Sequence, residues 1–439
     1  MIGKLQNRPP METDDPVELS SRAIDDGSTH EMTNRVIQKL AVLDDDIAIV
    51  ESFSHLIAFR TDAGLLCFDA SGAHTGGQVV DALRSWSTDP IHTLVYTHGH
   101  LDHVGGSGAM AEDAADRGHR PMDVVAHARV ADRFERYRTT NDWNISINSR
   151  QFGGISRSAG VGIWPEGRFL PESVIDPTTA FHDRLSFDVA GLAVELRHDL
   201  GETDDHAWAW LPEHRALCVG DFVTWVFPNC GNPQKVQRYP REWAAALREM
   251  MTFEAEWLFG AHGLPVRGAN RVRRVLDDLA TALEQLVEET LQMMNDGASL
   301  NDILHSVSLP ADTLERPWMM PIYDEPEFVV RNIWRLYGGW WDLNPAHLKP
   351  ATDAALGTEV SALAGGPLAL AQRAQELAEA GDHRLAGHLI EMAAAAAPDD
   401  PAVHGVRAEV WQARRDQELS LMSKGIYAAA ANDSNAHLA

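Results

Sequence analysis

The chain has 439 residues and a hydrophobic fraction of 44%, which indicates a folded protein with room for two or three domains. Its formal net charge is −27 at pH 7. A surface this acidic repels phosphate backbones and anionic lipids, so we expect neither nucleic acid nor a membrane as the main partner. An anionic substrate must then be attracted by metal ions or by local basic residues.

The cysteines are few and odd in number: Cys67, Cys218 and Cys230. This is not a disulfide framework, and it favours a reducing compartment. The stretch Met11–Pro16 is polar and acidic, unlike a signal peptide, and no stretch approaches the roughly 20 apolar residues of a membrane span. The sequence therefore predicts a cytoplasmic protein.

The first half of the chain alternates between two kinds of pattern. Residues 1–44 are expected to form an N-terminal arm with one short helix. Short apolar runs separated by Gly and Asp then predict strands joined by tight turns, with helices between them. The expected strands are Ile47–Val50, Leu56–Phe59, Leu65–Phe68 and His92–Thr97, and the expected helices are Gly76–Trp86 and a segment from Gly106.

The strand pattern returns later and completes an α/β arrangement. We expect strands at Leu192–Arg197, His206–Leu211, Ala216–Val219 and Glu256–Phe259, and a helix at Trp243–Met251. Interleaved strands and helices predict an α/β sandwich, although periodicity alone does not choose among α/β layerings.

After Gly268 the pattern becomes helical. Val272–Asn295 has apolar residues at helical spacing, and residues 351–366 are Ala- and Gly-rich, which is typical of a linker. Three further helical segments are expected at Leu368–Ala380, Arg384–Ala397 and Pro401–Lys424. Their breaks are like those of tetratricopeptide hairpins, with too few units for an array.

A cluster of potential metal ligands follows directly after the His92–Thr97 strand: His98, His100, Asp102 and His103. A strand end fixes the backbone, and the turn after it directs neighbouring side chains in different directions. Imidazole suits zinc, and a carboxylate can complete a second site. Four such side chains so close together favour a metal centre over a solvated loop.

The string Thr97–Gly106 resembles the HxHxDH signature of the metallo-β-lactamase superfamily. The fold of that family is an αββα sandwich with the metals at one edge. The resemblance implies that His98 and His100 bind a first metal and that Asp102 and His103 bind a second.

The resemblance also implies the remaining ligands. The third ligand of the first metal is expected at Glu202, where the family usually has His, and His198 and His206 are nearby competitors. Asp221 matches the carboxylate that bridges the metals, and His262 matches the last ligand of the second metal.

This set predicts two zinc ions per chain, with iron or manganese as alternatives at the carboxylate-rich first site. A hydroxide held between two metals is a nucleophile at neutral pH, and Asp102 and Asp221 are the expected catalytic carboxylates. Glu202 in place of His adds negative charge and makes the first metal a weaker electrophile, which would suit an anionic substrate.

The string Pro321–Pro345 is similar to the dimerisation domain of the alkyl sulfatases. This resemblance implies a metallo-β-lactamase-like catalytic domain at residues 45–298 and an all-α dimerisation domain at residues 299–430. It also implies that the Pro317–Tyr323 loop closes over the active site of a partner subunit.

Large apolar side chains in the same region predict a homodimer: Trp318, Met319, Met320, Trp334, Tyr337, Trp340 and Trp341. The alternative is that they pack against their own catalytic domain.

Three features differ from the usual alkyl sulfatase pattern. The sequence stops before a sterol-carrier-like domain, the bridging carboxylate is Asp221 rather than Glu, and the histidine and arginine that grip sulfate have no clear counterparts. Asn229, Lys235 and Arg238 are candidate anion contacts in their place. Arg331 lies near the missing histidine but fits a helix surface equally well.

The function we expect is hydrolysis of a sulfuric ester of a small or medium alcohol. A second hypothesis is cleavage of a carboxylic ester, lactone, β-lactam or phosphodiester at the same site. A non-catalytic dimeric scaffold is a third, and the complete ligand set argues against it.

Overall fold

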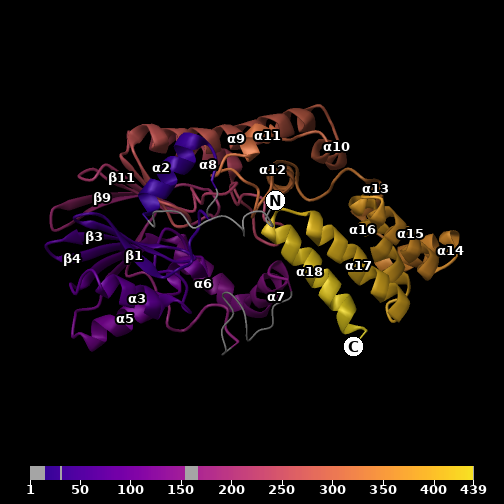
Figure 1. The fold of residues 1–439 in the computed structure, drawn as a ribbon, viewed down its shortest axis with the longest axis horizontal. Coiled ribbons are helices and arrows are strands. Elements are labelled where there is room, and N and C mark those ends of the chain that lie inside the picture. Colours follow the sequence, from indigo (N-terminus) through magenta and orange to yellow (C-terminus); the bar gives the residue numbers. More distant parts are fainter. Residues whose placement is uncertain (1–14, 30–31, 154–166, 439) are drawn as a thin grey trace.

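The computed structural model describes residues 15–29, 32–153 and 167–438, so residues 1–14 and 30–31 of the expected arm lie outside the described part. Two β-sheets pack face to face, helices cover the outer face of each, and a helical region follows toward the C-terminus (Figure 1). The expected αββα sandwich with a helical C-terminal region is confirmed.

The first sheet has seven strands within the described residues, in the order β1 to β7. The β1–β4 strands are antiparallel neighbours, whereas β4 to β7 run parallel. Their bounds are Lys39–Asp44 (β1), Ile47–Glu51 (β2), Leu56–Thr61 (β3), Gly64–Phe68 (β4), Ile91–Val95 (β5), Asp123–His127 (β6) and Thr179–Phe181 (β7).

The second sheet has six strands in the described residues, in the order β13-β12-β11-β10-β9-β8. Only β11 and β12 pair in parallel there, among the strands described. The bounds are Arg184–Val189 (β8), Leu192–His198 (β9), Ala207–Leu211 (β10), Ala216–Gly220 (β11), Trp257–Gly260 (β12) and Val266–Arg267 (β13).

Strand β10 shows how the layers are built. Ala207, Ala209 and Leu211 face the core between the two sheets, whereas Trp208 and Trp210 face the core under the outer helices. Because both faces are covered, the strand is buried along its whole length instead of alternating between buried and exposed residues.

Helices α3 (Gly76–Arg84), α5 (Ser107–Asp116) and α6 (Arg129–Thr139) pack on the first sheet. Helices α2 (Pro16–Asp26), α8 (Pro240–Met251) and α9 (Ala269–Asn295) pack on the second. The other described helices are α4 (Leu101–Val104), α7 (Asn141–Gln151), α10 (Leu300–Leu304), α11 (Ala311–Leu314), α12 (Pro326–Gly338), α13 (Pro345–Leu348), α14 (Asp353–Ala364), α15 (Pro367–Glu379), α16 (His383–Ala396), α17 (Pro401–Gln417) and α18 (Leu421–Ala436).

Two of the expected C-terminal segments were wrong. Most of the segment 351–366 forms helix α14 rather than a linker, because Thr352 caps its first turn and Gly365 ends it in the left-handed conformation. The segment expected as one helix at 401–424 is split into α17 and α18, since Ser420 accepts a hydrogen bond from Ser423 N and starts a new helix.

The N-terminal arm is part of the sandwich where it is described. Strand β1 is an edge strand of the first sheet, and α2 contributes Leu19, Ala23 and Ile24 to the core over the second sheet. Asp15 caps α2, accepting hydrogen bonds from Val17 N and Glu18 N.

The apolar residues expected at a dimer interface differ in burial, and Met320 and Trp341 are intermediate between the buried and the exposed ones. Trp318, Met319 and Trp334 are buried in the core beside α9 and the second sheet, which is the alternative packing. Tyr337 and Trp340 are exposed. Burial of the first three inside their own chain removes them from the argument for an interface.

No single helix of the described segments is long and apolar enough to cross a membrane, although the bent pair α14 and α15 passes on length and composition.

Candidate metal centre

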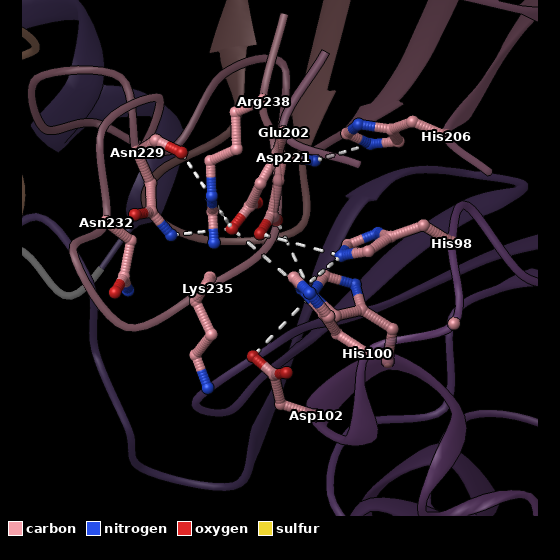
Figure 2. Close-up of polar contacts among 12 residues, drawn as sticks. His98, His100, Asp102, Glu202, His206, Asp221, Asn229, Asn232, Lys235 and Arg238 are labelled. Atoms are coloured by element: carbon pink, nitrogen blue, oxygen red, sulfur yellow. Dashed lines mark hydrogen bonds and ion pairs between the residues drawn. The ribbon is translucent and has the colours of Figure 1, made fainter. Parts of the chain in front are cut away.

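The candidate ligands gather where several strands end at the same edge of the sandwich. His98 to His103 follow β5, Asp221 follows β11, and His262 lies just after β12. Glu202 lies in the turn between β9 and β10. Figure 2 shows the carboxylates of Glu202 and Asp221 and the rings of His98 and His100 directed toward one another.

These side chains form two groups in the described chain that could each hold a metal ion: His98, His100, Glu202 and Asp221, and Asp102, His103 and His262. Within each group, the potential ligand atoms all lie within 4.8 Å of one another. In the first, His98 Nε2 is 2.8 Å from His100 Nδ1, and His100 Nδ1 is 3.8 Å from Glu202 Oε1. In the second, Asp102 Oδ2 is 3.6 Å from His103 Nε2 and 3.4 Å from His262 Nε2.

Asp221 lies between the two groups. Its Oδ2 is 3.9 Å from His98 Nε2, while its Oδ1 is 3.5 Å from His103 Nε2 and 3.4 Å from His262 Nε2. One carboxylate therefore presents an oxygen to each group, which is the arrangement that a bridging ligand requires.

Contacts on the outer side of the rings fix which nitrogens face the site. His103 Nδ1 hydrogen-bonds Asp69 Oδ2 at 2.8 Å, and Asp69 itself accepts from Thr97 N and Oγ1 at 2.8 Å each. His262 Nδ1 hydrogen-bonds Phe53 O. Both rings therefore turn Nε2 inward, as metal-binding histidines do when their other nitrogen is held.

The turn that carries the first histidines needs glycine at position 99. A Cβ on Gly99 would lie 2.8 Å from Arg133 Cδ and 3.0 Å from Asp205 Oδ2. Asp205 Oδ2 accepts a hydrogen bond from Gly99 N at 3.1 Å, and the Arg133–Asp205 ion pair is buried. The glycine thus lets a buried acidic group hold the backbone between His98 and His100.

The electrostatics of the site favour cation binding. Burial, followed by the neighbouring charge of His103 for His98 and of Arg133 for His100, holds the pKa of both rings well below the usual value. Burial opposes ionisation of Asp221, but the charges of His262 and His103 outweigh it and keep its pKa well below the usual range. His98 and His100 are thus neutral imidazoles beside an ionised carboxylate. Burial opposes protonation of His103 and His262, but the charge of Asp221 outweighs it and raises the pKa of both rings.

Several buried ligand atoms have no hydrogen-bond partner among the described residues: His103 Nε2, Glu202 Oε2 and Asp221 Oδ1. Such atoms are costly to bury unless a ligand satisfies them. Imidazole nitrogens with carboxylate oxygens are also the donor set of zinc sites, so the residues present fit a pair of divalent ions.

The two competitors of Glu202 make other contacts. His198 stacks on His127 with ring centroids 3.7 Å apart, and its Nδ1 hydrogen-bonds His206 O. His206 Nε2 accepts from Asp221 N at 3.1 Å. Among the described residues, neither belongs to a group that could hold a metal.

The candidate anion contacts do not share one environment. Asn229 Nδ2 donates to Glu202 Oε1 at 2.6 Å, and Arg238 forms a buried ion pair with the same carboxylate. Lys235 Nζ donates to Asn148 Oδ1 at 3.0 Å and extends toward the Asp102 side of the site (Figure 2). Arg331 lies on the surface of α12 and pairs with Glu327 one turn away.

The Pro317–Tyr323 loop contacts the catalytic part of its own chain. Phe227 N donates to Met320 O at 3.0 Å, and Gln151 Nε2 donates to Tyr323 OH at 2.7 Å. Burial, with a smaller effect from Glu202, raises the pKa of Tyr323. Our sequence reasoning missed Gln151 and Asp69, and it named Tyr323 only as part of a loop expected to close over a partner's site. Only Asp69 had a signal, since it directly follows a buried apolar strand.

Comparison with known proteins defines the class. Residues 52–262 match the family described as "Metallo-beta-lactamase superfamily", and residues 299–437 match "Alkyl sulfatase dimerisation". The chain therefore combines a metallo-β-lactamase superfamily domain with an alkyl sulfatase dimerisation domain, which confirms the resemblances of both the 97–106 string and the 321–345 string.

The relatives are alkylsulfatases. A linear primary-alkylsulfatase from a Pseudomonas species is 26% identical over 75% of this chain and 64% of its own length. An alkyl/aryl-sulfatase from Saccharomyces cerevisiae is 24% identical over 71% of this chain and 50% of its own length. The chain thus spans between half and two thirds of these relatives.

A solved structure has the same fold. The stereoselective inverting sec-alkylsulfatase Pisa1 from Pseudomonas sp. superposes with a TM-score of 0.79 at 20% identity, over 96% of this chain and 69% of its own length.

Proposed function

We propose that the chain is a hydrolase of alkyl sulfates with two metal ions, most simply zinc, at the site around Asp221. The observation that carries the proposal is the position of Asp221 between two ligand groups, in a chain whose relatives are alkylsulfatases. In this proposal His98, His100 and Glu202 would hold one metal, Asp102, His103 and His262 would hold the other, and Asp221 would contribute to both.

The bound metals would supply an activated water as nucleophile and positive charge for the oxygens of the ester. The chain's own residues do the rest. Asp69 and Phe53 O hold His103 and His262 with Nε2 inward, and Asp221 sets the spacing of the two groups. Lys235 offers a cation on the Asp102 side of the site (Figure 2).

Two further parts of the proposal concern the whole protein. We propose a homodimer, supported by the match to the dimerisation domain. We also propose a reducing, cytoplasmic compartment, since Cys67, Cys218 and Cys230 are buried and unpaired.

A panel of linear and branched alkyl sulfates, with released sulfate measured by ion chromatography, tests the activity. We expect about two metal ions per folded chain, sulfate release by the loaded protein, and loss of both metal and release under strong chelation. Hydrolysis in ¹⁸O-water would show whether the label enters sulfate or alcohol, and hence whether attack is at sulfur or carbon.

Asp221→Ala is the matched variant. Without the bridging carboxylate the spacing of the groups is lost, and we expect a folded protein without turnover. Near-native sulfate release by this variant would contradict the bridging role.

Activity on chromogenic carboxylic esters, lactones, β-lactams or phosphodiesters but not on alkyl sulfates would favour the alternative ester substrates. Fewer than one metal ion per chain would remove the proposal altogether.

A further inference from the structure

Glu202 is held by Asn229 and Arg238, two residues that the sequence analysis proposed as contacts for the anionic substrate. Its side chain is buried, and Oε1 accepts from both Asn229 Nδ2 and Arg238 NH1. Oε2 is buried without a partner in the described residues. The two donors thus occupy one oxygen and leave the other for a ligand.

Arg238 is itself fixed from several sides. Its guanidinium also donates to Asn229 O, so it links the turn after β11 to the turn before β10. Its carbonyl oxygen accepts from Asn332 Nδ2 of helix α12 at 2.9 Å. Because Arg238 is only 2% exposed, its guanidinium has no open path to a substrate unless the contacts with Glu202 break.

The charge of the pair matters as much as its geometry. A glutamate in a position that could be histidine brings one extra negative charge to the first ligand group, and a buried charge without a partner is strongly unfavourable. Arg238 supplies the matching positive charge next to it. The first group with Arg238 included therefore carries the same net charge as a group with a neutral imidazole in place of Glu202.

Resting on the metal site proposed above, we propose that Arg238 is a positioning residue that orients Glu202 and balances its charge, with Asn229 as its helper. Glu202 then does not weaken the first metal as an electrophile, contrary to the expectation from its charge alone. A different cation then binds the anionic group of the substrate.

Lys235 is that cation. It is half-buried, and its ammonium makes one hydrogen bond among the described residues, with Asn148 Oδ1. An ammonium has three N–H groups, so two are left for an anion. Burial, followed by the charge of Arg238, lowers the pKa of Lys235 to about 8, so the ammonium still carries its proton at pH 7. The side chain extends toward Asp102 (Figure 2). In this proposal Lys235, rather than Arg238, binds the sulfate group of the substrate.

The test separates retention of metal from binding of substrate. Metal affinity is measured by competition with a chromogenic chelator, on zinc-loaded and cobalt-loaded protein, and the cobalt spectrum reports the coordination. Arg238→Gln and Asn229→Ala should each weaken retention of one of the two metals by about 10- to 100-fold and change the cobalt spectrum. Arg238→Lys, which keeps the charge, should restore part of that affinity.

Lys235→Met is the contrasting variant. It should keep both metals with wild-type affinity and an unchanged cobalt spectrum, while KM for an alkyl sulfate rises about 10-fold or more. Arg84→Gln is the matched control, because it removes another largely buried ion pair, that with Asp113. Arg84 also donates to Asp89 O just before β5 begins, whereas the metal ligands follow the other end of that strand. We expect that control to keep wild-type metal affinity.

Unchanged metal affinity in both Arg238→Gln and Asn229→Ala overturns the proposal, whatever happens to KM. If Arg238→Gln does not fold, Asn229→Ala decides the question by the same measure. The metal titrations need no substrate. A wild-type protein that cleaves no alkyl sulfate would refute the proposed function, but the titrations would still test the role of Arg238.

Discussion

Asp69 and His103 are joined by a hydrogen bond of 2.8 Å between Oδ2 and Nδ1, and both side chains are fully buried. Asp69 has a positive φ of 56°, and Thr97 N and Oγ1 donate to its two carboxylate oxygens. A carboxylate held this firmly fixes the ring orientation of His103 and the nitrogen that faces the site.

We therefore expect Asp69→Ala to loosen the metal held with His103. Affinity for one metal should fall by about 10- to 100-fold because the ring is no longer oriented. Elemental analysis after dialysis against a weak chelator measures this. Ser54→Ala is the control, since Ser54 Oγ lies 3.3 Å from the same nitrogen and is the weaker contact. Equal metal retention in wild type and Asp69→Ala would show that Asp69 does not orient the ring.

The identity of the third ligand of the first metal is tested by three single variants. Glu202→Ala should lose one metal, because the first group then keeps Asp221 as its single carboxylate and loses the one beside His100. His198→Ala should keep both metals, since its ring stacks on His127 away from the group. Metal content is counted for each purified variant. Two metals retained in Glu202→Ala, with one lost in His198→Ala or His206→Ala, would reverse the assignment.

The sequence indicated which residues meet at the site better than what each one touches. Ligand candidates follow apolar strands, and strand ends of one sandwich share an edge, so the meeting of His98, Asp221 and His262 was foreseeable. The partner of Arg238 was not, because a long basic side chain reaches either a substrate or a buried carboxylate from the same position. Only the fold places Glu202 beside it.

The helices past residue 350 show a similar limit. Alanine and glycine are common both in linkers and in tightly packed helices, so composition did not separate the two. Gly357 of α14 decides it: a Cβ there would lie 2.4 Å from Met392 O of α16, which shows a close helix contact. Contacts between segments far apart in the sequence, rather than local pattern, set the structure here.

The stability of the fold should depend on pH through His55. This side chain is fully buried, with Nδ1 accepting from Ser52 N at 3.0 Å and Nε2 donating to Gly263 O at 2.6 Å. Burial, followed by the charge of His262, lowers the pKa of His55 from 6.5 to about 3. Between these two values the unfolded chain binds a proton that the folded chain does not, so the free energy of unfolding falls as pH falls through this window.

The contribution of His55 to the loss between pH 7 and pH 5 is about 2 kcal/mol, from about 1.4 kcal/mol per pH unit below 6.5. Urea unfolding at the two pH values measures it. His55→Gln should lose about 2 kcal/mol less over the same interval than wild type, whereas the exposed His305→Gln serves as control. The same pH dependence in wild type and His55→Gln would show that another group is responsible.

The protein should form a homodimer through the exposed apolar side chains after α12. Trp340 is 71% exposed and Leu363 is 90% exposed, both within the part of the chain that matches the dimerisation domain. Exposed aromatics of this kind are typical hot spots of interfaces, where one substitution costs about 2 kcal/mol or more. Trp340→Glu should therefore weaken dimerisation by about 30-fold or more, measured by sedimentation equilibrium. Trp143→Glu, which replaces an exposed tryptophan of α7, is the control and should leave the dimer intact.

Removing everything after residue 300 is a poorer test of dimerisation. Trp318, Met319 and Trp334 belong to the core over α9, so we expect an insoluble product. A full-length chain that sediments as a monomer at micromolar concentration would exclude the dimer.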